Sequence, residues 1–139
     1  MKRFILMLLL GCSVAMAGGI KWEKGYESAL KQSKALNKPI MFIISSHDCR
    51  FCVMFDATTL KNPKVIKKLN TDYISVIAYM DENPVFPRQL YVDGTPATWF
   101  LKSDGEPMFQ PVMGAVDSET FLKALDVVKK EYAANAQKK

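Results

Sequence analysis

Two cysteines separated by two residues, Cys49 and Cys52, have the type and spacing that could do chemistry in this chain. A thiolate is the nucleophile of thiol–disulfide exchange, and the first turn of a helix stabilises it through free N–H groups and the helix dipole. The pair follows an apolar run and precedes a helical pattern, so Cys49 is expected at a helix N-terminus. This placement predicts a redox-active pair, in which Cys49 attacks a disulfide and Cys52 resolves the mixed disulfide.

Two other interpretations of the pair remain open. A structural disulfide is one of them, although a four-residue loop at a helix start gains little stability from loop closure. The other is a copper-handling module, because thiolates and thioethers are soft ligands and the chain is rich in methionine. Core packing is the commoner role of methionine. The methionines concerned are Met54, Met80, Met108 and Met113.

Four polar or aromatic neighbours of the cysteines are candidates for tuning or binding. His47, the only histidine of the chain, and Asp48 could tune the thiols. His47 could equally be a solvated loop residue, and Asp48 could cap the helix. Arg50 and Phe51 could face a substrate or be ordinary surface residues. A cation at Arg50 favours a Cys49 thiolate and Asp48 opposes it.

The first 17 residues have the features of a secretory signal peptide. Lys2 and Arg3 precede an apolar stretch, and Ala15-Met16-Ala17 forms a small-residue cleavage pattern. We therefore expect a signal peptide over residues 1–17 and export to the periplasm or its equivalent. Lipidation at Cys12, within a sequence similar to a lipobox, is the alternative. Without Cys12 only the Cys49–Cys52 pair remains, and in an oxidising compartment a disulfide between them is the default.

The composition indicates one globular domain, expected over residues 18–139. Hydrophobic residues make up 49% of the 139 residues and charged residues 24%, which excludes a disordered chain. The net charge of +5 falls to +3 once the two basic residues of the leader are removed. No long basic run exists, so nucleic acid is not an expected partner.

Alternating patterns predict an α/β fold with a central mixed sheet flanked by helices on both faces. The continuous apolar run of residues 39–45 is typical of a strand buried on both sides. The expected order is α-β-α-β-α-β-β-α. Its elements are a helix from Trp22 to Leu36, the strand 39–45, helices to Leu60 and after Asn62-Pro63, the strand 73–79, a helical piece at 88–91, strands 97–101 and 107–112, and a last helix capped by Asp117 or Ser118.

With the segment Gly94-Thr95-Pro96-Ala97 before a strand, the C-x-x-C motif resembles that of the thioredoxin superfamily. Asp104-Gly105-Glu106, Gly114 and the last helix match the closing unit of that fold. The match is similar to periplasmic thioredoxin-related, SoxW-like proteins. The resemblance implies a thioredoxin fold in which Pro96 is cis and faces the cysteines, and in which the backbone of Thr95 contacts the substrate chain.

The chain departs from the family pattern in three respects. The dipeptide between the cysteines is Arg50-Phe51, where thioredoxins have Gly-Pro and strong oxidases have Pro-His. Asp48 stands where an aromatic residue is usual, and Ile43 stands where many members keep a buried carboxylate. Proton transfer would then use water, His47, Asp48 or another group.

The resemblance implies an exported thiol–disulfide oxidoreductase, more a reductase than an oxidase or isomerase. It implies a monomer without cofactor or metal, acting on exported thiol or disulfide proteins and served by a membrane electron donor or acceptor. The alternative is a copper-handling or non-catalytic binding module of the same fold.

Overall fold

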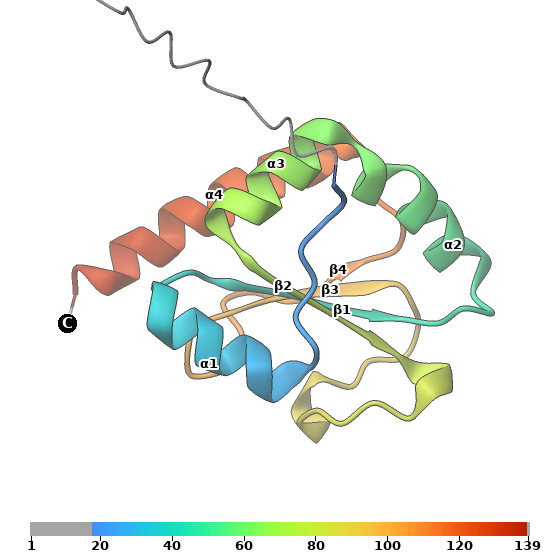
Figure 1. Ribbon diagram of the computed structural model, residues 1–139, viewed down its shortest axis with the longest axis horizontal. Helices are drawn as coiled ribbons and strands as arrows, with labels where there is room; N and C mark the ends of the chain where they lie inside the picture. The colour runs from blue at the N-terminus through green and yellow to red at the C-terminus, as the bar shows by residue number, and fades with distance from the viewer. Residues whose placement is uncertain (1–17, 139) are drawn as a thin grey trace, which may run out of the picture.

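A four-stranded sheet in the order β2-β1-β3-β4 forms the centre of the computed structural model, which describes residues 18–138 (Figure 1). β1 (Ile40–Ser45) pairs in parallel with β2 (Ile74–Tyr79) and antiparallel with β3 (Ala97–Leu101). β4 (Val112–Met113) extends the sheet antiparallel to β3. The predicted α/β fold with a mixed sheet is therefore confirmed.

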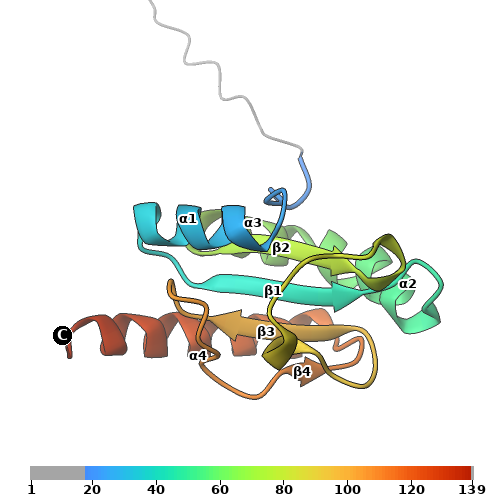
Figure 2. The ribbon, with the colours of Figure 1, turned by 90° about the horizontal axis from the view of Figure 1, so that it is seen from below.

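Helices cover both faces of the sheet. Figure 1 views the sheet along its edge, and Figure 2 shows the same ribbon after a quarter turn. One face carries α1 together with the connection between β2 and β3, and the other carries α2, α3 and α4. The helices are α1 (Tyr26–Leu36), α2 (Arg50–Ala57), α3 (Pro63–Asp72) and α4 (Ser118–Ala136), with short 3-10 helices η1 (Thr59–Lys61), η2 (Met80–Glu82) and η3 (Arg88–Leu90).

The strand β1 lies between two apolar clusters, and this explains its unbroken apolar sequence. Ile40, Phe42 and Ile44 point into the cluster beneath α1, whereas Met41 and Ile43 point into the cluster beneath α2, α3 and α4. All six residues of the strand are buried. A strand buried on both faces is rigid, and its C-terminal end is a firm base for the segment that follows.

Helix starts follow the capping residues of the sequence. The side chain of Asn62 accepts hydrogen bonds from the N–H groups of Lys64 and Val65 at the start of α3. The side chain of Asp117 accepts one from the N–H of Thr120 at the start of α4. Of the two predicted caps for the last helix, Asp117 is the one that the structure bears out.

Two predicted boundaries were wrong. Trp22 is not helical: it forms a parallel bridge with Ser75, and α1 begins only at Tyr26. Its apolar side chain fits the helical spacing by coincidence, because an extended segment there covers the edge of β2. The second strand of the hairpin is confined to β4, and Pro107 makes only an isolated bridge with Leu101. Pro107 and Pro111 lack the N–H group that a longer ladder needs.

The predicted signal peptide, its cleavage after Ala17 and the alternative lipidation at Cys12 concern residues 1–17, which lie outside the described part of the chain. Among residues 18–138, no helix combines the length and the apolar character needed to cross a membrane.

The packing of α4 gives a test of the core. Leu125 is fully buried, whereas Val127 on the same helix is 58% exposed. Leu125→Ala should lower the free energy of unfolding by about 2–5 kcal/mol through lost burial and a cavity. Val127→Ala, the matched control, should change it by less than about 0.5 kcal/mol. Urea unfolding measures both, and equal losses would contradict the described packing.

Candidate active site

The two cysteines lie where β1 gives way to α2. Cys49 is the N-cap residue of α2, and its Sγ atom accepts a hydrogen bond of 3.2 Å from the N–H of Cys52. Cys52 lies one turn into the helix and is 3% exposed. The placement predicted from the sequence is therefore confirmed, and a free N–H group of the first helical turn points at the Cys49 sulfur.

The strand β3 brings a second segment to the same sulfur. Ile44, near the end of β1, pairs with Ala97 at the start of β3, so the residues before β3 lie beside the cysteines. The peptide bond between Thr95 and Pro96 is cis, and the Sγ atom of Cys49 donates a hydrogen bond of 3.4 Å to the carbonyl oxygen of Thr95. The structure thus brings together Cys49, Cys52 and the Thr95–Pro96 segment.

The two sulfurs differ in accessibility and in acidity. Both cysteines are thiols here, Cys49 partly exposed and Cys52 buried. Burial alone would raise the pKa of Cys49, but hydrogen bonds from the side chains of Cys52 and Thr95 and from the N–H groups of Cys52 and Phe51 outweigh it and lower that pKa. Cys49 is therefore the thiol that solvent can reach and that loses its proton more readily than a free thiol, and Cys52 is shielded behind it. The disulfide between them stays a prediction.

The residues between and before the cysteines are on the surface. Arg50 is exposed, and the Phe51 side chain is 60% exposed. Asp48 is exposed too, and it does not cap α2, because Cys49 takes the N-cap position with its own side chain. The interpretation of Asp48 as the cap was wrong: the helix begins one residue later than that role requires.

His47 is attached to a residue that the sequence did not single out. The backbone N–H of His47 donates to Oδ1 of Asp81 at 3.0 Å, and the ring Nδ1 atom of His47 lies 2.7 Å from Oδ2 of the same carboxylate. The ring stacks on Tyr79 with a centroid distance of 3.9 Å. The hydrogen bond with Asp81 raises the pKa of His47, and the same bond lowers the pKa of Asp81 to about 2. The sequence contained a hint of this contact. Asp81 directly follows β2, which is parallel to β1, so it lies at the same end of the sheet as the cysteines.

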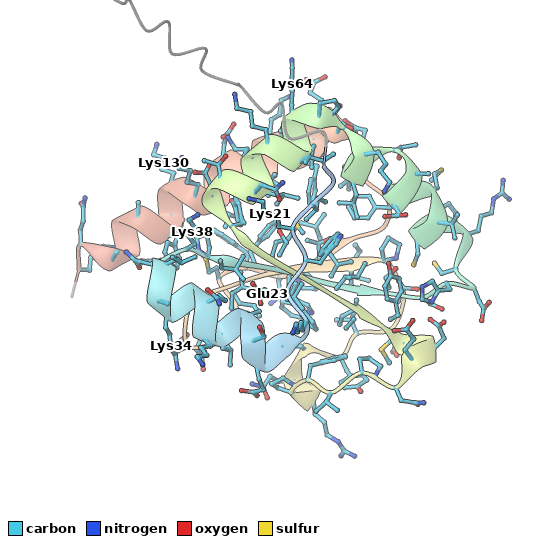
Figure 3. The ribbon with its side chains drawn as sticks, in the orientation of Figure 1. Lys21, Glu23, Lys34, Lys38, Lys64 and Lys130 are labelled. Carbon is cyan, nitrogen blue, oxygen red and sulfur yellow. The ribbon has the colours of Figure 1, made fainter. Side chains whose placement is uncertain are left out.

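Lysines are distributed away from the cysteines. The chain has no lysine between Lys38 and Lys61 or between Lys68 and Lys102, the two stretches that build the site. Figure 3 shows the labelled lysines on the N-terminal segment, on α1 and the turn that follows it, on α3 and on α4. The two residues that flank Cys49 in the sequence, Asp48 and Arg50, are both charged.

The copper-handling alternative directs attention to the side chains that could ligate a metal ion. Within residues 18–138, no group of three or more histidine, cysteine, aspartate or glutamate side chains could hold one. Met80 and Met108 pack against the two core clusters, whereas Met54 and Met113 are exposed. Core packing accounts for two of these four methionines, fewer than predicted, because the other two lie on the surface.

Comparisons with known proteins agree with this arrangement. A family model described as "Thioredoxin-like domain" matches residues 26–129. The chain belongs to the thioredoxin-like family. A search of curated protein sequences gave no significant match.

Solved structures show the same fold at low identity. A thioredoxin from Thermus thermophilus is 23% identical with a TM-score of 0.71, over 86% of this chain and 94% of that one. A DsbH oxidoreductase is 19% identical with a TM-score of 0.64, over 82% and 87%. The C-terminal domain of Neisseria meningitidis DsbD in its oxidised form is 21% identical with a TM-score of 0.54, over 73% and 95%. The predicted thioredoxin fold is confirmed.

The difference between the sulfurs predicts selective alkylation. With the reduced protein, iodoacetamide should modify Cys49 well before Cys52, and the rate should rise with pH around a pKa below that of a free thiol. Peptide mass spectrometry identifies the modified cysteine. Faster modification of Cys52 would contradict the described burial.

The contact with Asp81 predicts the titration of His47. As the only histidine, His47 gives a single imidazole signal in NMR, and its pKa should lie above 6.5. Asp81→Asn should bring that pKa back toward 6.5. Because the folded pKa is the higher one, the contact stabilises the fold below pH 6.5, and its contribution is lost as the pH rises through the folded pKa. An unchanged titration in Asp81→Asn would show that the pair does not form.

Proposed function

We propose that this protein is a thiol–disulfide oxidoreductase that uses Cys49 and Cys52. The observation that carries the proposal is the position of Cys49, which caps α2, lies within reach of the Thr95 carbonyl, and has a lowered pKa beside a buried second thiol. The C-x-x-C motif, the fold and the family membership support it.

The reaction follows from the two sulfurs. The Cys49 thiolate attacks one sulfur of a substrate disulfide, an S–S bond forms to Cys49, and the other substrate sulfur leaves as a thiolate that takes up a proton. Cys52, after losing its proton, attacks the Cys49 sulfur and releases the second substrate sulfur as a thiol. The protein ends with a Cys49–Cys52 disulfide, and the substrate has gained two electrons. Oxidation of a substrate dithiol runs the same steps in reverse.

The surface around Cys49 suits an extended polypeptide substrate. Thr95 is partly exposed next to the sulfur, and a substrate backbone could pair with it while Phe51 offers an apolar contact. Pro96 is buried and shapes this segment from within. Arg50 is exposed at the same helix start and would meet the substrate or its charge. These roles of Thr95, Pro96, Arg50 and Phe51 are part of the proposal.

The preferred direction is reduction of disulfides in exported proteins. Cys49 and Pro96 are 47 residues apart, and between them the described chain contains only α2, η1, α3, β2, η2 and η3, so no inserted helical domain of the kind found in strong oxidases lies there. The leader of residues 1–17 supports a periplasmic location, with anchoring at Cys12 as the other option. A monomer related to SoxW-like proteins, recharged by a membrane electron donor, is the version we propose.

A trapping variant tests the function. Cys52→Ser removes the resolving thiol, so the Cys49–substrate disulfide should persist and accumulate at least about tenfold over wild type, since its fast intramolecular resolution is lost. Non-reducing gels with mass spectrometry of exported-protein extracts would detect it. Cys49→Ser is the matched control and should trap nothing. Equal trapping by both variants, or by neither, would contradict the proposed roles.

A further inference from the structure

The loop of residues 46–49, which carries Cys49, is held to the rest of the fold mainly by contacts of His47 with the end of β2. Inside the loop, the N–H groups of Cys49 and Asp48 both reach Ser46, at 3.3 Å in each case. The two contacts between His47 and Asp81, at 3.0 and 2.7 Å, are shorter. The side chain of Asp81 is 30% exposed, and it binds the backbone and the ring of one residue at once. The strongest polar attachment of this loop is therefore Asp81.

Asp81 is itself fixed relative to the sheet. It lies in η2, which directly follows β2, and Tyr79 at the end of β2 pairs with Ser45 at the end of β1. The His47 ring stacks on Tyr79 with an interplanar angle of 15°. The imidazole is thus fixed by a stacked ring on one side and a carboxylate at its edge, both supplied by the end of β2.

We propose that Asp81, acting through His47, is a positioning residue that fixes the Cys49 sulfur for reaction, an inference that rests on the proposed function. The Cys49 thiolate depends on donors at defined places, above all the N–H of Cys52 at 3.2 Å. A hydrogen bond weakens steeply as its length and angle depart from the optimum. Releasing the loop two residues before Cys49 would therefore weaken the bonds that stabilise the thiolate, although Asp81 touches neither the sulfur nor a substrate.

The sign of the effect separates positioning from simple electrostatics. If Asp81 acted on Cys49 only through space, removing its negative charge would favour the thiolate and lower the pKa of Cys49. If Asp81 positions the loop, removing it raises that pKa. The direct effect of the Asp81 charge and the positioning effect therefore have opposite signs, and because removing Asp81 also lowers the pKa of His47, the His47 variants described below separate lost imidazole charge from lost position.

The test compares Asp81→Ala with Glu82→Ala in the full chain. Glu82 is the matched control: it carries the same charge one residue on, and its carboxylate lies 3.9 Å from His47 Nδ1 without a hydrogen bond. The readout is the rate of Cys49 alkylation by iodoacetamide from pH 5 to 9, which requires no protein substrate. At pH values below the pKa of Cys49, Asp81→Ala should lower the alkylation rate by roughly twofold to tenfold. This change corresponds to the free energy of one hydrogen bond. Glu82→Ala should leave it unchanged or raise it slightly.

A second pair of variants keeps the proposal falsifiable if Asp81→Ala folds poorly. His47→Asn retains an N–H donor for Asp81, whereas His47→Phe retains only the stacked ring, and both remove the imidazole charge. Positioning predicts that the phenylalanine variant has the higher Cys49 pKa and that the asparagine variant stays near wild type. Equal pKa values in the two variants, or a lower pKa in Asp81→Ala, would overturn the proposal. Failure of substrate trapping with these pKa shifts present would overturn the proposed function alone.

Discussion

The site depends on one constraint, the capping of α2 by the side chain of Cys49. A helix leaves its first N–H groups without partners in the helix, and here the group of Cys52 turns to the Cys49 sulfur. This contact places the second cysteine one turn away and buried, and it lowers the pKa of the first. The rest of the fold holds this junction in place, because β1 is buried on both faces and fixes the point at which the helix begins.

The sheet explains how distant segments of the chain meet at this junction. β2 runs parallel to β1 and ends beside it, so the residues after β2 contact the loop before Cys49. β3 runs antiparallel and starts beside the end of β1, so Thr95 arrives at the Cys49 sulfur from the other side. Three strand ends therefore bring together the Cys49 sulfur, the Thr95 carbonyl oxygen to which it donates, and the Asp81 carboxylate that binds His47.

Local patterns in the sequence predicted most of the fold and the centre of the site. The apolar run of β1, the helix that restarts at Asn62-Pro63 and the C-x-x-C motif at a helix start all depend on near neighbours, and the structure confirms them. Trp22 was misplaced because its bridge to Ser75 at the edge of β2 depends on a strand far along the chain. Asp81 was missed for the same reason, since its contact with His47 spans 34 residues and depends on the register of two strands.

The most direct test of the central claim is the reduction potential of the Cys49–Cys52 pair, measured by equilibration with glutathione or dithiothreitol buffers. The pair should show one reversible two-electron transition, and a reductase should have its midpoint near that of thioredoxin, roughly −270 mV. A midpoint near −120 mV would keep the redox role and reverse the preferred direction. A pair that never closes into a disulfide, or that no buffer can reduce, would contradict the account.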